Sequence, residues 1–483
     1  MKIRSILLPL GALLLSGAVQ AAPATPAASA TAKAATRNCH LPGSEDTLRC
    51  LTVPVPLDYA KPGGPGIKIH VTVAPAFREA ARNDPLFVLA GGPGQAGSEV
   101  LPLLSAAFRR VRATRDIVFI DQRGTGLSGK LDCDDKGDQE SMSEAEMMAE
   151  LRTCLAKNKA PLAAYTTAAA ARDLEQVRRT LGYGQVNVWG GSYGTRLGQA
   201  YVRAYPSSVR SLILDGVAAP DQVIPAGGRD SQSALDGLFA ACAKDAACNK
   251  AYPNLAGEFT ALAAKVETGN VRLSLPNPRT AEPTDFTMTS ERFLGTVHSI
   301  LYAPADARRL PFLIHSASRG RWQPFVARQN LVGDFGNDAS MSMLLHFAVV
   351  CAEDVPRFTP ELMKSDAAVL AKPLAEMIPR LCQDIKVPAV PYVAPSRIEA
   401  PALLLSGALD PVTPPHRAQT AAKSMARAQH VVVANAGHGV SQLGCAPRLL
   451  RAFLDQPQAK LDAACVAEIP APTFQLGSAG PQP

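Results

Sequence analysis

The sequence predicts an α/β protein, built on a mostly parallel β-sheet that helices cover on both faces. Short apolar runs alternate along the chain with segments of helical periodicity. These runs have no polar face, as expected of parallel strands buried on both sides. Residues 219–398 break the alternation, because they are punctuated by proline and helical in pattern. We expect this segment to be a helical cap, inserted after the sixth strand, over the sheet edge where α/β proteins bind ligands.

Two strands and two helices are predicted in the first part of the α/β core. One run leads into glycines, the next ends at Asp121, and a helix then begins at a capping box of Ser143 and Glu146. Gly182 closes a second helix, as glycine commonly does after the last helical turn. The expected strands are residues 86–90 and 117–120, and the expected helices are residues 143–157 and 168–181.

The following part repeats the pattern around a short glycine turn. A strand at residues 186–189 leads into Gly190-Gly191-Ser192-Tyr193-Gly194, after which a helix is expected over residues 195–204. Three further apolar runs follow, and the cap separates the first of them from the other two. These strands are expected at residues 209–214, 402–405 and 430–433.

The N-terminus has the pattern of a secretory signal peptide. Lys2 and Arg4 precede an apolar run at residues 6–15, and Val19-Gln20-Ala21 is a small-residue cleavage site. The run is too short to span a bilayer and no later segment approaches that length, although a retained membrane anchor is the alternative. We therefore expect a secreted or periplasmic protein with no membrane anchor after cleavage. The predicted organisation is a signal peptide at 1–21, a disordered linker at 22–37, the core at 38–218 and 399–470, the helical cap at 219–398, and a C-terminal tail at 471–483.

Composition and charge restrict the class of protein. Of the 483 residues, 47% are hydrophobic and 19% are charged, which fits a globular protein with a large core rather than a disordered chain. The formal net charge is +7, and cleavage of residues 1–21 removes two bases and no acids, leaving +5. So mild a surplus, spread along the chain, does not predict a nucleic-acid partner.

The cysteines predict disulfides rather than a metal site. Their number is ten, and an even count behind a signal peptide indicates an oxidising compartment. Their spacing favours sequential pairs that each close a local loop, although sequence alone does not fix the connectivity. No Cys-x-x-Cys pair or histidine pair has the spacing of metal ligands, so we expect neither a metal nor a cofactor. The candidates are Cys39, Cys50, Cys133, Cys154, Cys242, Cys248, Cys351, Cys382, Cys445 and Cys465.

Ser192 is the candidate nucleophile. It is the central residue of a Gly-x-Ser-x-Gly motif that follows an expected strand and opens an expected helix. The flanking glycines tolerate a sharp turn and let a substrate approach closely. The start of the helix also favours the negative charge that develops in the reaction. The alternative is an ordinary strand-to-helix turn without chemistry.

A serine hydroxyl needs a base, and the base needs a carboxylate to orient it. His438 lies between two glycines just after the last expected strand, whereas His416 lacks such a setting and is the weaker alternative. Asp410 lies just beyond another strand, and Ser192, Asp410 and His438 then occur in the chain order of an α/β-hydrolase triad. Asp215 also ends a strand and is the competing acid, but it comes one strand too early.

The negative oxygen of a tetrahedral intermediate needs two backbone N–H donors. The residue after the nucleophile, Tyr193, supplies one, and we expect Gly92, in the sequence Gly91-Gly92-Pro93-Gly94, to supply the other. The alternative for this loop is a plain Gly-Pro turn. Asp121 and Arg123 are interpreted as structural residues that hold a neighbouring loop.

Several motifs together resemble one family, the prolyl aminopeptidases and tripeptidyl aminopeptidases of the α/β-hydrolase fold. The resemblance covers residues 51–450 and implies a mostly parallel eight-stranded sheet, a helical cap, and the roles given above to the triad and the oxyanion loop. Ala90 stands where the prolyl branch commonly has histidine, which argues against strict proline specificity. The secreted, cysteine-rich form of the chain looks more similar to the tripeptidyl branch. The motifs are Ala90 to Gly94, Asp121 to Ser128, Gly190 to Arg196, Gly407 to Pro414 and Gly437 to Gly439.

The resemblance implies that the protein cleaves peptides from a free N-terminus. Similar enzymes hold the substrate amine with carboxylates of the cap, which makes Glu353 the candidate for this role, with Asp354 second. A shielded carboxylate suits the role, because leaving an ammonium unpaired there is costly. The alternative is that one of the two acids caps a helix and the other pairs with an arginine.

Two other functions stay open. An esterase or a hydrolase of small amides uses the same triad, because the triad does not choose the acyl donor. A non-catalytic binding protein on the same fold is the second, and the intact set of Ser192, Asp410 and His438 argues against it.

Overall fold

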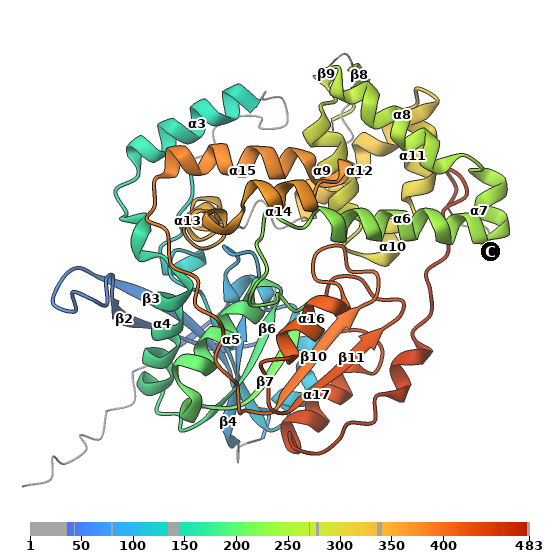
Figure 1. Ribbon diagram of the computed structural model, residues 1–483. Coiled ribbons are helices and arrows are strands. Elements are labelled where there is room, and N and C mark those ends of the chain that lie inside the picture. Colours follow the sequence, from blue (N-terminus) through green and yellow to red (C-terminus); the bar gives the residue numbers. More distant parts are fainter. Residues whose placement is uncertain are drawn as a thin grey trace, which may run out of the picture.

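The computed structural model of the chain describes residues 36–42, 44–78, 81–133, 144–269, 271–276, 280–335 and 341–480. The predicted signal peptide and most of the predicted linker lie outside the described residues. Arg37, which the sequence places in the linker, is the first residue of a strand, β1 (Arg37–Cys39). The chain forms an α/β core with a largely helical cap above it (Figure 1).

The core is a nine-stranded sheet with the strand order β1-β2-β3-β5-β4-β6-β7-β10-β11. The three N-terminal strands pair antiparallel with their neighbours, and the strands from β5 to β11 in this order run parallel. Without the three-residue β1, the sheet has the eight strands that the resemblance implies, and the cap follows the sixth of them. The other strands are β2 (Leu48–Pro56), β3 (Gly66–Ala74), β4 (Arg82–Leu89), β5 (Arg115–Ile120), β6 (Val186–Gly191), β7 (Val209–Asp215), β10 (Ala402–Gly407) and β11 (Ala428–Val433).

Helices cover both faces of the sheet, and alternate residues of the central strands pack against them. In β10, Leu404 belongs to the core on one face, and Leu403 and Leu405 belong to the core on the other. Because both faces are buried, these strands carry the all-apolar sequences that predict them. The first face packs against α4 (Thr167–Thr180), α5 (Tyr193–Ala204) and α16 (Pro415–Ala422), and the second against α1 (Leu103–Ala106), α2 (Arg109–Arg112) and α17 (Ala446–Asp455).

Helix α4 has the ends that its sequence indicates. The Thr166 side chain accepts a hydrogen bond from the backbone N–H of Ala169, which satisfies one of the free donors of the first turn. Gly182 follows the last turn with a φ of 72°, a left-handed value that favours glycine. The helix predicted at residues 168–181 is therefore confirmed.

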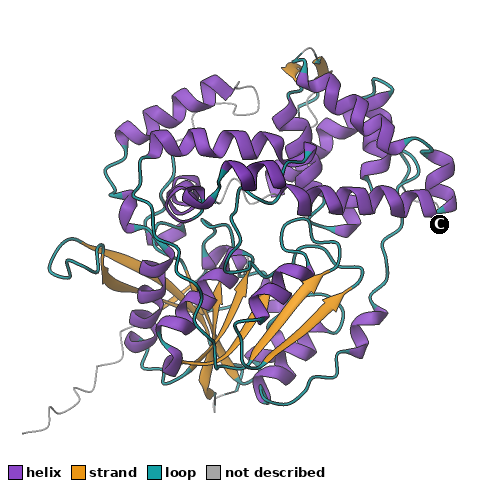
Figure 2. Ribbon diagram, viewed as in Figure 1, coloured by secondary structure: helices purple, strands orange, loops and turns teal. Residues whose placement is uncertain are grey.

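Between β7 and β10 the chain forms the cap, which lies above the carboxyl ends of the parallel strands (Figure 2). It has its own core, in which Phe293, Trp322 and Phe325 are buried against one another. A hairpin of β8 (Arg272–Pro276) and β9 (Pro283–Thr287) interrupts the helices and is not among the predictions. The cap helices are α6 (Gly228–Lys244), α7 (Ala246–Ala251), α8 (Leu255–Glu267), α9 (Ser290–Ile300), α10 (Pro304–Ala307), α11 (Leu310–Ser318), α12 (Gln323–Phe335), α13 (Met343–Glu353), α14 (Pro360–Ser365) and α15 (Lys372–Ile385).

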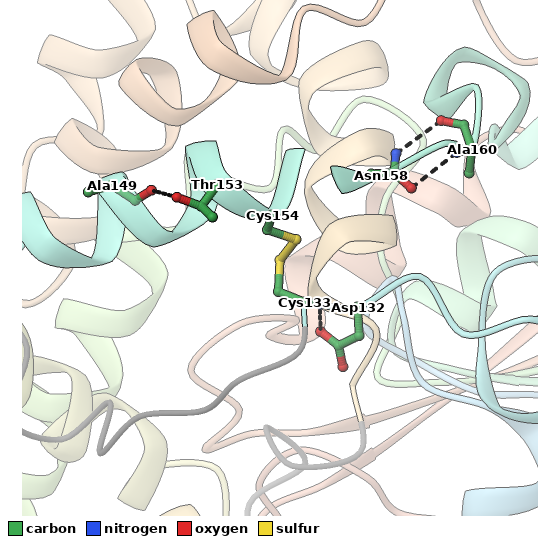
Figure 3. Close-up of a disulfide and its surroundings, with 7 residues drawn as sticks. All are labelled: Asp132, Cys133, Ala149, Thr153, Cys154, Asn158 and Ala160. Atoms are coloured by element: carbon green, nitrogen blue, oxygen red, sulfur yellow. Dashed lines mark hydrogen bonds between the residues drawn. A yellow bond between two sulfur atoms is a disulfide. The ribbon is translucent and has the colours of Figure 1, made fainter. Parts of the chain in front are cut away.

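The helix predicted at residues 143–157 is α3 (Glu144–Lys157), and it lies with the cap although it precedes β6. It runs beside α15 (Figure 1), where Arg152 and Asp384 form an ion pair at 2.9 Å. A disulfide between Cys133 and Cys154 ties α3 to the chain that leaves the core (Figure 3). Ser143, and with it the predicted capping box, lies outside the described residues.

All ten cysteines form disulfides, each between two cysteines that are consecutive in the sequence. The predicted local pairing is therefore confirmed. In the part of the chain that the structure describes, no helix is long and apolar enough to cross a membrane. The same residues contain no group of three or more side chains arranged to hold a metal ion. The pairs are Cys39–Cys50, Cys133–Cys154, Cys242–Cys248, Cys351–Cys382 and Cys445–Cys465.

The C-terminal segment, predicted as a tail, leaves the core and packs on the cap. Phe474 is buried in the core of the cap, and the Arg308 guanidinium lies 4.1 Å from the centre of its ring. The Gln475 N–H donates to the Arg308 carbonyl at 3.1 Å. The Gln475 carbonyl in turn accepts from the Tyr252 hydroxyl at 3.0 Å. These contacts join the end of the described chain to the ends of α7 and α10 of the cap.

Candidate active site

Ser192 lies in a sharp turn at the carboxyl end of β6. Its φ of 53° and ψ of −123° are unusual for a residue with a side chain, and α5 begins at the next residue. Two glycines permit the turn, because a Cβ at Gly190 would overlap the Gly194 carbonyl and a Cβ at Gly194 would overlap that of Leu89. The Ser192 N–H donates to the Asp215 carbonyl at 2.9 Å, which fixes the turn to β7. This strand, turn and helix have the geometry that presents a nucleophilic serine.

His438 and Asp410 lie together on the loops that follow β11 and β10. Nδ1 of His438 is 2.8 Å from Oδ2 of Asp410. The other carboxylate oxygen accepts the backbone N–H groups of Val412 and Thr413 at 2.9 and 2.8 Å. The Thr413 hydroxyl donates to Oδ2 at 2.7 Å. Asp410 is 2% exposed, so these four contacts fix the direction of a buried carboxylate.

The two residues shift each other's pKa in opposite directions. Burial raises the pKa of Asp410, but the charge and hydrogen bond of His438, together with the hydrogen bonds of Thr413, outweigh it and hold the pKa below its ordinary value. Burial lowers the pKa of His438, but the Asp410 carboxylate, together with the charge of Asp215, outweighs it and holds the pKa above its ordinary value. A carboxylate that stabilises the protonated imidazole favours transfer of a proton from a serine hydroxyl to that imidazole.

The two competing residues lie elsewhere. Asp215, at the end of β7, accepts the backbone N–H groups of Val440 at 2.8 Å and Ser441 at 2.7 Å. It thereby anchors the loop that carries His438. His416 is 56% exposed and lies 3.3 Å from Asp230 of α6. The geometry therefore favours Asp410 over Asp215 as the acid and His438 over His416 as the base.

Asp215→Asn is expected to destabilise the fold by about 2 kcal/mol and to retain most of the activity. The substitution turns one acceptor oxygen into an NH₂ group that faces a backbone N–H, whereas the Asp410–His438 pair keeps both members. Thermal unfolding and kcat/KM, measured beside Asp410→Asn, check this expectation. If Asp215→Asn lost as much activity as Asp410→Asn at an unchanged Tm, Asp215 would be acting on the imidazole itself.

Gly92 and Tyr193 border Ser192 on the wall of a cavity. Gly92 has a φ of 106°, and a Cβ there would stand 2.6 Å from the Gly94 nitrogen. The neighbouring Gly91 lies so close to the turn that its Cβ would stand 3.1 Å from that of Ser192. Gly92 and Tyr193 therefore lie beside Ser192 on the same wall, and their role as the two donors of an oxyanion hole stays a prediction.

Asp121 and Arg123 hold the loop beside this site, as the sequence predicts. Asp121 accepts the backbone N–H groups of Ser98 at 2.7 Å and Leu127 at 2.9 Å. Arg123 is 1% exposed and forms an ion pair with Asp173 of α4 at 2.7 Å. Both side chains are occupied within the core, which leaves the chemistry to the residues around Ser192.

Ser192 lines a cavity of about 260 Å³ between the core and the cap, and so does Thr413, which contacts both Asp410 and His438. The core provides the floor with Gly92, Ser192, Tyr193 and Thr413. The cap provides a mainly apolar roof with some polar side chains. Its residues are Ile224, Pro225, Gly227, Ser231, His298, Tyr302, Met341, His346, Ala371 and Ile378.

Glu353 and Asp354, predicted to bind a substrate amine, have partners within the protein. Glu353 accepts the backbone N–H and the hydroxyl of Thr167 at 2.7 and 2.6 Å, at the start of α4. Burial raises its pKa, against the effect of these two bonds. Asp354 is fully buried and pairs with Arg196 at 3.0 Å and Arg357 at 2.9 Å. These contacts fit the alternative of a helix cap and an ion pair, and amine binding by the partly exposed Glu353 stays a prediction.

Three residues beside the candidate triad are not among the predictions: Thr413, Tyr302 and His298. Thr413 follows Asp410 by three residues, and this spacing indicates that its hydroxyl contacts the acid. Tyr302 follows α9, and its backbone carbonyl accepts the backbone N–H of His438 at 2.9 Å. Its ring centre is 5.2 Å from that of the His438 imidazole. No local pattern in the sequence predicts this contact, because it arises from the packing of the cap on the core.

A family model described as alpha/beta hydrolase fold matches residues 84–441. This range contains Ser192, Asp410, His438 and the glycine loop at residues 91–94. The chain therefore belongs to the alpha/beta hydrolase family, which confirms the fold class that the sequence predicts.

Within this family the chain is similar to two named peptidases and a named esterase. It is 31% identical over 280 residues to the serine protease Hip1 of Mycobacterium tuberculosis, which is 53% of either chain. It is 31% identical over 213 residues to the tripeptidyl aminopeptidase of Streptomyces coelicolor, which is 40% of this chain and 39% of that one. Carboxylesterase B of M. tuberculosis is 33% identical over 167 residues, which is 34% of this chain and 29% of that one. The chain thus spans about half or less of the length of these relatives, and the resemblance that its motifs indicate is confirmed.

Proposed function

We propose that the protein is a serine peptidase that forms an acyl-enzyme on Ser192. His438 takes the proton of the Ser192 hydroxyl as its oxygen attacks the substrate carbonyl carbon, and Asp410 stabilises the resulting imidazolium. The backbone N–H groups of Gly92 and Tyr193 hold the negative oxygen of the tetrahedral intermediate. The imidazolium then protonates the leaving amine as the C–N bond breaks, and water, activated by His438, releases the acyl group. The observation that carries the proposal is the 2.8 Å contact between His438 and Asp410, in one site with a serine in a strained turn.

The small cavity supports cleavage close to a chain end. Its volume of about 260 Å³ is below the range of about 300–1,000 Å³ that is usual for small-molecule pockets. A serine peptidase keeps the N-terminal side of its substrate as the acyl group, so a small roofed site limits how many residues precede the scissile bond. This supports an aminopeptidase acting on peptides with a free N-terminus, in keeping with the name of the Streptomyces relative.

We further propose that the protein is secreted or periplasmic. Five disulfides support an oxidising compartment, since intracellular thiols are kept reduced in most organisms. The basic and apolar pattern of residues 1–21 supports an export signal.

Matched substrates test the aminopeptidase proposal. The purified protein is offered a tripeptide p-nitroanilide with a free amine, the same compound with an acetylated amine, and a simple ester. We expect the free-amine peptide to be cleaved with the highest kcat/KM. Equal rates on the acetylated and free peptides would contradict cleavage from the N-terminus while leaving the serine chemistry intact.

Glu353→Gln tests whether this acid binds the substrate amine. Glutamine keeps one oxygen to accept from the Thr167 N–H but removes the charge. If Glu353 binds an ammonium, KM for free-amine peptides should rise about tenfold or more, and hydrolysis of a small neutral ester should stay nearly unchanged. An equal loss on both substrates, together with a lower Tm, would show that Glu353 only caps α4. Asp366→Asn is a matched control, because Asp366 accepts the first N–H groups of α6 at 2.7 and 3.1 Å in the same way.

An esterase is the second candidate, and one observation favours it. Among the described residues that line the cavity there is no aspartate or glutamate, and Arg196 is paired with Asp354. A neutral acyl group fits such a lining without a charged partner. A higher kcat/KM for the ester than for every free-amine peptide would make this candidate the better one.

A further inference from the structure

A second histidine lies at the site, and the proposed mechanism does not use it. His298 is near the end of α9 and lines the same cavity as Ser192. Its ring centre is 5.4 Å from that of Tyr302, in a T-shaped contact. Tyr302 makes the same kind of contact with His438, at 5.2 Å. His298 is therefore one aromatic ring away from the candidate base.

The ring nitrogens of His298 are open to a ligand. In the described part of the chain no residue hydrogen-bonds either of them, whereas the rings of His315 and His346 bond to Glu258 and to the Pro93 carbonyl. The residue is partly exposed, and it belongs to the cavity wall. A substrate that fills the cavity displaces water from these nitrogens, and a polar group that is then left without a partner is costly. A polar group of the substrate would supply the partner that the protein does not.

The imidazole of His298 is a neutral acceptor. Burial lowers its pKa to about 4, although the nearby charge of Asp410 acts in the opposite direction. A neutral imidazole has one N–H donor and one nitrogen lone pair that accepts. An α-amino group titrates at about 7.7–8.0 and therefore keeps its proton beside such a ring and donates to it. The described cavity lining contains no carboxylate that would compete for this proton.

We propose that His298 accepts a hydrogen bond from the nitrogen of the substrate residue whose carbonyl Ser192 attacks. If one residue is released, this nitrogen is the free amine, and if the acyl group is longer, it is an amide N–H. The inference rests on the proposed acyl-enzyme at Ser192 and adds the substrate class. Acyl groups with an α-nitrogen are preferred over the same acyl groups without one, and a residue of the cap makes the distinction.

Matched pairs of substrates test the proposal. L-Alanine benzyl ester and benzyl propionate share a leaving group and differ only in the amino group, and the p-nitroanilides of alanine and propionic acid form a second pair. For each pair, the ratio of kcat/KM with and without the nitrogen is measured in the wild type, His298→Leu and His298→Gln. We expect a wild-type ratio well above one and a fall of about tenfold in His298→Leu, mainly through KM. His298→Gln keeps an acceptor and should recover most of the ratio. Trialanine p-nitroanilide shows whether an amide N–H serves as well as the amine.

The ratio separates a contact with substrate from a structural role. If His298 has only a structural role, its substitution lowers kcat/KM by the same factor for both substrates of a pair. An unchanged ratio in His298→Leu would therefore overturn the proposal. If the esters are cleaved and the anilides are not, the peptidase proposal fails while the ester pair still decides on His298. Without turnover, protection of Ser192 from a fluorophosphonate by alaninamide or propionamide gives the same ratio. Equal protection by the two amides in the wild type would also overturn the proposal.

Discussion

Ser192→Ala is expected to lower kcat by about 10⁴- to 10⁶-fold and to leave the fold intact. The substitution removes the atom that becomes acylated, while His438, Asp410 and the oxyanion loop stay in place. These groups do little without the nucleophile, because the members of a triad act as a unit. Alanine adopts the φ of 53° no less easily than serine, so the turn should persist. Kinetics on the free-amine peptide, together with thermal unfolding, measure both expectations.

Two controls accompany the Ser192 variant. Ser207→Ala changes an exposed serine in the turn before β7, at the opposite edge of the sheet, and should leave kcat unchanged. A fluorophosphonate should label the wild type and Ser207→Ala once each and should not label Ser192→Ala. Retention of more than about a thousandth of the wild-type rate in Ser192→Ala would exclude Ser192 as the nucleophile.

Asp410→Asn is expected to lower kcat by about 10⁴-fold. Asparagine is close in shape, but its NH₂ group either faces the Thr413 hydroxyl and His438 Nδ1, or turns towards the backbone N–H groups of Val412 and Thr413. In the first orientation His438 Nδ1 must accept, which places the imidazole proton on the other nitrogen, where it blocks transfer from Ser192; in the second a donor meets two donors. In both the imidazole loses the carboxylate that stabilises its protonated form. Asp215→Asn, which removes a buried carboxylate from the neighbouring strand end, is the matched comparison. Similar losses in both variants at unchanged Tm would contradict the assignment of Asp410.

Asp410→Asn should also shift the pH dependence of kcat/KM to lower pH. The free enzyme needs a neutral His438, so kcat/KM falls as the pH drops through the pKa of this residue. Because Asp410 raises that pKa, the wild-type midpoint should lie above the ordinary value of about 6.5. Removing the negative charge lowers the pKa and moves the midpoint to a lower pH. A midpoint that stayed in place would show that another group controls the acid side.

The parts of the site that sequence predicts are those set by local chain geometry. Ser192 needs glycines on both sides and a strand and helix around it, and all of these lie within a few residues of it. Asp410 and Asp215 are harder to separate from sequence, because β7 and β10 are neighbours in the sheet and each acid lies at or just beyond the end of a buried strand. Only the hydrogen-bond partners distinguish the acid that meets the imidazole from the acid that holds its loop.

Contacts between distant segments are not predictable in this way. Glu353 has the burial expected of an amine site, but its partner Thr167 lies 186 residues earlier in the chain. Tyr302 and His298 reach the site only because the cap folds onto the core. Strands β2 and β3 are not among the predicted strands. Strand β2 alternates buried and exposed residues and carries two prolines, whereas the predicted strands are runs that are apolar on both faces.

The C-terminal segment determines how the cap can move. The chain enters the cap from β7 and returns to β10, and these neighbouring strands place the two connections close together. Helix α3, which precedes β6, also lies with the cap. Phe474 and Gln475 add a further attachment, at the ends of α7 and α10. Rotation of the whole cap would require Phe474 to leave its apolar site, which opposes such a motion. Substrate is therefore expected to enter through shifts of individual cap segments over a frame that stays in place.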